Sequence, residues 1–88
     1  MKKKDRERLE KARDVAVAYV ASQGYERCSA TLPYPPPPGA EAIYVSVTAA
    51  RLTQRGNYAG PVFFGVKVHL RGYQGTMLVP EIVDTTYS

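Results

Sequence analysis

The sequence has few of the residues that build covalent or metal-based frameworks. Its 88 residues include one cysteine, one histidine and no tryptophan. A single cysteine excludes an intramolecular disulfide and cannot supply a four-ligand zinc site. We therefore expect no metal and no cofactor, and we expect Cys28 to stay reduced in a cytoplasmic setting.

Long apolar runs are also missing. The longest, Val15 to Ala21, is far shorter than the roughly 20 residues that a membrane-spanning helix needs. Asp5, Glu7 and Glu10 follow the first lysines, where a secretory leader would require an apolar stretch. We expect neither a membrane segment nor a secretory leader.

The basic charge is confined to one end of the chain. Residues 1–13 hold seven basic and three acidic side chains, which accounts for the whole net charge of +4, and residues 14–88 hold five of each. A length of 88 residues with 44% hydrophobic residues indicates one small globular domain, 1–88, with a basic tail at 1–4. Proteins that bind a phosphate backbone usually spread Lys and Arg over one face. Here the excess of basic residues lies within residues 1–13 alone.

A helix is predicted over residues 5–23. Asp5 is placed as its N-cap, and Gly24 as the left-handed residue that ends it. Arg6 and Glu10, four residues apart, are expected to pair on the solvated surface. The apolar residues that follow the three-and-four spacing of one helix face are Leu9, Ala12, Ala16, Tyr19 and Val20.

Four strands are predicted from alternating apolar and polar residues, at 25–32, 42–53, 62–71 and 76–83. A stiff proline-rich connector, 33–39, separates the first two. Pro80 indicates that the last strand has a free edge. Residues 84–88 are expected to form a frayed tail, and a bulge is expected near Ala49–Arg51, where the alternation slips.

The second and third strands are predicted to form a hairpin with the loop at residues 54–61. One register that matches their apolar faces sets Val45 opposite Leu70 and Val47 opposite Val68. On the other face it sets these pairs opposite each other: Tyr44 and Arg71, Ser46 and His69, Thr48 and Lys67.

The predicted architecture is α+β, with one N-terminal helix packed on a four-stranded antiparallel sheet in the order α-β-β-β-β. This order of elements is similar to the cystatin and monellin architecture, and the resemblance extends to element order alone. The helix covers one face of the sheet and leaves the other open. A core this small yields little net stability, so we expect a homodimer or a higher oligomer.

Catalytic chemistry has little support in the sequence. Cys28 is expected in the core and His69 on the opposite face, so the one nucleophile-and-base pair should not meet. The carboxylates lie on a solvated helix surface or flank strands, where no two converge on a pocket. No glycine stands between a strand and a following helix, where a phosphate loop would lie. We expect a protein that is not an enzyme and has no catalytic residue.

The segment from Tyr34 to Pro38 resembles the aromatic-plus-polyproline peptides that EVH1 domains bind. A preformed extended helix loses little entropy when it docks on an aromatic groove. The alternative is a rigid loop that covers the edge of the sheet.

The favoured function is protein binding through the open sheet face and the hairpin loops. Domains of this size suit regulators, inhibitors, adaptors and assembly parts, including those of phages and mobile elements, and the charge-paired helix would also suit an engineered scaffold. The alternative is nucleic-acid binding by the basic N-terminus with Lys67 and Arg71. The predicted binding residues are Tyr44, Phe63, Lys67, His69, Arg71, Arg55 and Tyr58.

Overall fold

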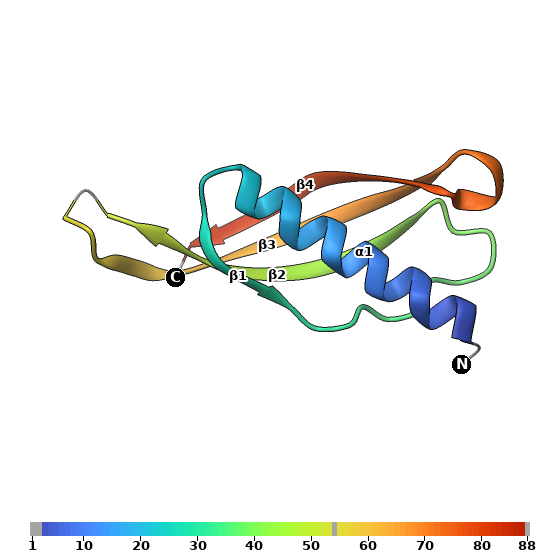
Figure 1. The fold of residues 1–88 in the computed structure, drawn as a ribbon, viewed down its shortest axis with the longest axis horizontal. Helices are drawn as coiled ribbons and strands as arrows, with labels where there is room; N and C mark the ends of the chain where they lie inside the picture. Colours follow the sequence, from blue (N-terminus) through green and yellow to red (C-terminus); the bar gives the residue numbers. More distant parts are fainter. Residues whose placement is uncertain (1–2, 54, 88) are drawn as a thin grey trace.

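A long N-terminal helix lies across one face of a four-stranded antiparallel sheet in the computed structural model (Figure 1). The structure describes residues 3–53 and 55–87. The sheet order follows the chain order, β1-β2-β3-β4, which confirms the predicted α+β architecture. The elements are α1 (Lys3–Ser22), β1 (Glu26–Ala30), β2 (Ala42–Leu52), β3 (Tyr58–Arg71), a short 3₁₀ turn η1 (Tyr73–Gly75) and β4 (Met77–Tyr87).

The helix buries the stripe that its spacing predicts. Leu9, Ala12, Ala16 and Val20 are at most 2% exposed, whereas Tyr19 is half-buried. Two alanines at the centre of the stripe keep the helix close to the sheet. At the C-terminal end, the amide of Gly24 donates to the carbonyl of Ala21 at 3.1 Å, and its φ of 96° is the left-handed conformation expected there.

The two central strands supply the other half of the core. Alternate residues of β2 and β3 are buried beneath α1, as the period of two predicts. The ring of Tyr25 meets that of Phe64 edge-on, with the centroids 4.8 Å apart. The buried core residues on these strands are Ile43, Val45, Val47, Ala49, Val62, Phe64, Val66 and Val68.

The predicted hairpin register is wrong by four residues. Val45 lies opposite Val66 rather than Leu70, and Tyr44 lies opposite Lys67 rather than Arg71. The strands extend to Leu52 and Tyr58, so the turn is centred two residues earlier than the predicted loop. An even shift keeps each side chain on its face, which explains why the predicted faces are correct. The other two predicted pairs become Ser46 with Gly65 and Thr48 with Phe63.

Both predicted chain ends need correction. Residues 84–87 continue β4 and pair with β3, instead of fraying. Lys3 and Lys4 belong to α1, so the part of the basic tail that is described is helical, and Asp5 lies in the first turn instead of capping it. Residues 1, 2 and 88 lie outside the described part of the chain, as does Gln54 of the predicted loop.

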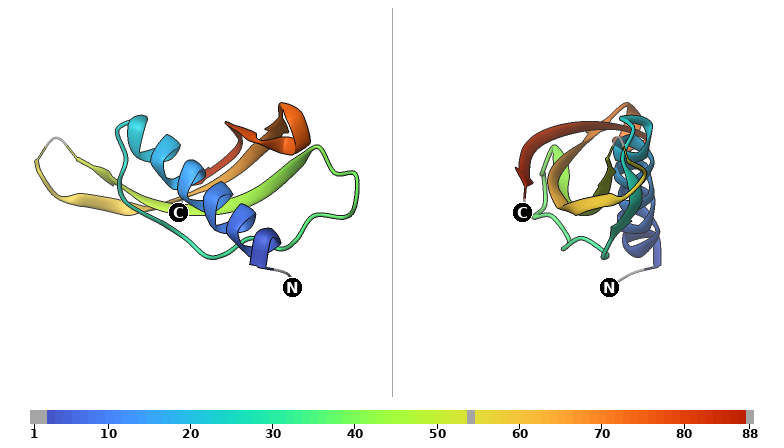
Figure 2. Two further views of the ribbon diagram at one scale, coloured as in Figure 1. Left: turned by 45° about the vertical axis from the view of Figure 1, so that its right-hand side comes forward. Right: turned by 90° about the vertical axis from the view of Figure 1, so that its left-hand side faces the viewer.

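The molecule is elongated, with extents of 46 × 23 × 17 Å. The β2–β3 hairpin projects beyond α1 and the other strands, at the left of Figure 1. The rotated views show the helix on one side of a strongly twisted sheet (Figure 2). In the ranges 3–53 and 55–87, no helix is both long enough and apolar enough to cross a bilayer.

Replacing Ala16 by leucine should destabilise the fold by about 1–3 kcal/mol, because the added methylenes have no space between α1 and the sheet. Ala18 is exposed two residues further along the same helix, so Ala18→Leu should change the stability by less than about 0.5 kcal/mol. Urea unfolding followed by circular dichroism measures both. Equal effects would contradict the proposed close packing.

Candidate functional site

The face of the sheet that points away from α1 is the candidate site, and we call it the open face. It carries the exposed side chains of β2 and β3 that alternate with the core, together with their neighbours on β4. The rotated views place α1 on the other side of the sheet (Figure 2). Its residues are Tyr44, Ser46, Thr48, Phe63, Gly65, Lys67, His69, Arg71, Met77, Val79, Glu81, Val83, Asp84 and Thr86.

Large apolar side chains are exposed on this face. Tyr44 is 64% exposed, Phe63 45%, Met77 59% and Val83 49%. The ammonium of Lys67 lies 5.9 Å from the centroid of the Tyr44 ring, within the range of a cation–π contact. Aromatic residues with a neighbouring cation are typical of surfaces that bind proteins.

A hydrogen-bonded pair of side chains lies in the middle of the open face. His69 Nε2 lies 2.6 Å from Glu81 Oε2. Because a carboxylate only accepts hydrogen bonds, the ring donates through Nε2–H. This bond lowers the pKa of Glu81, and the positive charges of Lys67 and Arg71 lower it further.

The charges of the open face are sorted by strand. The basic side chains Lys67, His69 and Arg71 come from β3, and the acidic Glu81 and Asp84 come from the neighbouring β4. Lys67 and Glu81 lie directly opposite each other in the register. The face therefore has two adjacent rows of opposite sign.

A bulge shapes the face beside these rows. The pairing of β3 with β4 shifts between Gly65 and Val66, which brings both Val83 and Asp84 to the same side of β4. A Cβ added at Gly65 would lie 3.3 Å from the Cβ of Asp84 and 3.9 Å from Val83 Cγ2. The two strands therefore approach each other closely at Gly65.

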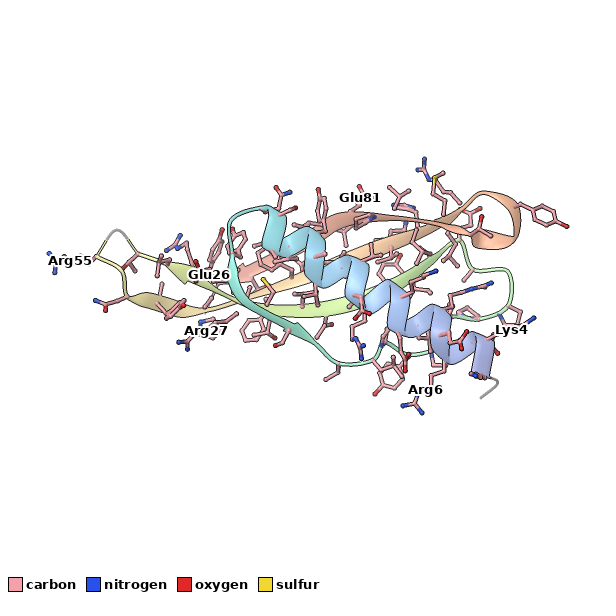
Figure 3. All side chains as sticks on the ribbon, viewed as in Figure 1. Lys4, Arg6, Glu26, Arg27, Arg55 and Glu81 are labelled. Atoms are coloured by element: carbon pink, nitrogen blue, oxygen red, sulfur yellow. The ribbon has the colours of Figure 1, made fainter. Side chains whose placement is uncertain are left out.

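The seven predicted binding residues do not form one cluster. The structure brings Tyr44, Lys67 and His69 together at the middle of the open face, with Phe63 further along β3. Arg71 ends β3, whereas Arg55 is at the hairpin tip, at the opposite end of the molecule from Lys4 and Arg6 (Figure 3).

Tyr58 joins a different arrangement, at the base of the hairpin. Its hydroxyl donates to Glu26 Oε2 at 3.0 Å, and the guanidinium carbon of Arg27 lies 3.9 Å from its ring centroid. Glu26 and Arg27 are adjacent in β1 beside the hairpin (Figure 3). These contacts hold the hairpin against β1, so Tyr58 acts mainly in positioning the hairpin.

Sequence reasoning missed part of the face. Glu81, Met77 and Val83 belong to it, but the register between β3 and β4 cannot be read without locating the bulge. Arg27 was also missed; its φ of 52° places it at the register shift of β1. The sequence position of Glu81 could have suggested that it belongs to the face, because it follows Pro80 in the strand that pairs with the strand of His69.

Both edges of the sheet resist strand addition. On β4, Pro80 lacks an amide donor and the bulge at Val83 interrupts the edge, which confirms the prediction of a free edge at Pro80. On the other side, β1 has five residues and a register shift at Arg27. The predicted bulge in β2 is also present, because the β2–β3 register shifts between Ala50 and Leu52.

The proline-rich connector runs beside β2, beyond the end of β1. Tyr34 is 93% exposed, and Gly39 takes the left-handed conformation, with φ 82°, before the chain enters β2. A groove of about 500 Å³ separates Pro35–Pro37 from Tyr44 and Lys67. The connector therefore borders the open face.

Cys28 and His69 lie on opposite faces of the sheet, as expected. The Cys28 thiol packs at the margin of the core, and its Sγ lies 3.6 Å from the carbonyl oxygen of Tyr25. Burial raises the pKa of the Cys28 thiol, so the reactive thiolate is disfavoured. Among the described residues, no group of three His, Cys, Asp or Glu side chains is placed to hold a metal ion.

Comparisons with protein-family models, with curated proteins and with solved structures found no match to this chain. The similarity to cystatin and monellin therefore remains one of element order, and the function has to be argued from the open face itself.

Replacing His69 by leucine should raise the pKa of Glu81 toward its ordinary value, because the main cause of the lowered pKa is removed. The hydrogen bond of this pair stabilises the fold at pH values above the pKa of Glu81 in the unfolded chain, about 4.3. This stabilisation is lost as the pH falls through the lower pKa of Glu81 in the folded chain. Carboxyl ¹³C NMR titration measures the shift. Lys67→Gln is the control and should move it less; an unchanged Glu81 titration in His69→Leu would contradict the assignment.

The Cys28 thiol should react slowly with an aromatic disulfide reagent in the folded protein, at least about tenfold slower than in urea, because both burial and a raised pKa oppose the thiolate. Absorbance of the released thiolate measures the rate. A folded-state rate equal to that in urea would show that the thiol is accessible and activated.

Proposed function

We propose that this chain is a small protein-binding module that acts through the open face and has no catalytic role. The observation that carries the proposal is the exposure of Tyr44, Phe63, Met77 and Val83 on the sheet face that α1 leaves uncovered. The core residues lie on the other face, so these four side chains add little to the fold. Exposed aromatic and methionine side chains beside cations are the usual anchors of protein interfaces.

The blunted edges support the choice of this face. A partner that added a strand to β4 would meet Pro80 and the bulge at Val83, and β1 offers five residues. The open face has neither obstacle. The hairpin extends this surface, because Arg55 projects beyond β1 and β4 at its tip (Figure 3).

A photocrosslinking amino acid in place of Tyr44 should form a covalent adduct with a protein in an extract of the cells that produce this chain. The same group in place of Lys11, which is exposed on α1, is the matched control and should not form that adduct. Gel mass and mass spectrometry identify the adduct. Phe63→Ser should abolish it, while 0.5 M salt should weaken it much less than it weakens binding to nucleic acid, because part of the contact is apolar.

Equal adducts from positions 44 and 11, or an adduct that survives Phe63→Ser unchanged, would contradict binding through the open face. The Phe63→Ser chain must keep its helical circular dichroism for the comparison to count.

Nucleic-acid binding is the second candidate, favoured by one observation. Three basic residues of α1 line a cleft of about 420 Å³ beside Gly75 and Thr76, together with the acidic Glu7; the three are Lys4, Arg8 and Lys11. This function predicts oligonucleotide affinity that falls steeply with salt and is lost when Lys2–Lys4 are removed. Lys67 and Arg71 lie on the open face, on the other side of the sheet from α1, so one strand of nucleic acid would not reach both groups without wrapping the edge.

A further inference from the structure

The two charged rows of the open face make that face complementary to itself. Lys67 and His69 stand on β3, and Glu81 and Asp84 stand on β4. Two copies can pack face to face about a two-fold axis. The axis lies between the two open faces, runs parallel to the strands and passes above the line between β3 and β4. This rotation places β3 of each copy over β4 of the other without shifting either along the strand direction.

The opposite charges then meet. Because Lys67 and Glu81 lie opposite each other within one sheet, the rotation sets Lys67 of each copy over Glu81 of the other. Each Glu81 keeps its hydrogen bond from His69 in its own chain and gains the ammonium of the other copy. A carboxylate that loses water needs such additional partners.

The same rotation decides what surrounds the central pair. It sets Gly65 of one copy over Val83 and Asp84 of the other. Within each chain these two side chains already border Gly65, so their exposed surfaces form this part of the contact. Val83, which is 49% exposed, would thus lie within the contact in both copies.

Other two-fold arrangements are less favourable. An axis that crosses the strands at Lys67 and Glu81 sets each of these charges against its own copy, so like charges meet. Pairing of β4 with β4 meets Pro80 and the bulge. The axis parallel to the strands is the arrangement that pairs opposite charges.

We infer that the occupant of the open face is a second copy of this chain, packed face to face with Lys67 of each copy against Glu81 of the other. The inference rests on the proposed function, since it names the partner of the same face. Stacked sheets lie about 10 Å apart and cross at about 30°, so the contact is closest at Lys67 and Glu81 and loosens toward the strand ends.

A charge-swap mixing experiment tests the inference. Lys67→Glu gives a chain with two acidic residues at the contact, and Glu81→Lys gives one with two basic residues. The unmodified chain should sediment as a dimer of twice 9.7 kDa. Each variant alone should dimerise at least about a hundredfold more weakly, and an equimolar mixture of the two should recover the dimer.

Intramolecular effects cannot produce recovery on mixing, because each variant keeps its own unfavourable pair in both samples. Charge reversal at Arg55, away from the contact, is the control and should leave the dimer intact. If either swap variant loses its helical circular dichroism, Lys67→Gln and Glu81→Gln replace the pair, and each should weaken the dimer.

A monomeric unmodified chain, dimeric single variants or a mixture that stays monomeric would each overturn the inference. The proposed function fails separately: a monomeric chain whose residue 44 still crosslinks to a different protein loses only the second copy as partner. Sedimentation of the unmodified chain decides the second copy, whereas absence of any adduct specific to position 44 counts against the proposed function of the wider open face.

Discussion

The one-sided burial of the sheet by α1 is the constraint on which the rest of the structure depends. Ala12 and Ala16 let the helix lie close to β2 and β3, and the valines beneath it become inaccessible to water. With one helix and one sheet, the chain buries one face of each. The candidate binding surface is therefore the side of the sheet that this contact leaves uncovered.

The architecture could be predicted because two simple periods specify it. The spacing of Leu9, Ala12, Ala16 and Val20 identifies the helix face, and alternation identifies the faces of β2 and β3. The register could not be predicted in the same way. Any even shift satisfies the alternation equally well, and only the position of the turn at Arg55–Gly56 selects one.

The candidate site was predictable to the same degree. Tyr44, Lys67 and His69 share the open face because alternate residues of each strand point to the same side of the sheet. This holds in any register that matches the apolar faces. Their partners on β4 were not predictable, since the bulge at Val83 has no marker other than the glycine opposite it. Glu81 therefore appears only once the strands are paired, although it is hydrogen-bonded to the one histidine of the chain.

The extra residue in β4 also changes which residues of that strand point toward the helix. Before the bulge the even-numbered residue Ile82 points toward the helix, and after it the odd-numbered Tyr87 does, where it lies opposite Val62 and shares a hydrogen bond with Tyr25. In a regular strand of the same sequence, without the bulge, Tyr87 would point to the open face and away from Tyr25. A single irregularity thus lets one strand serve both ends of a twisted sheet.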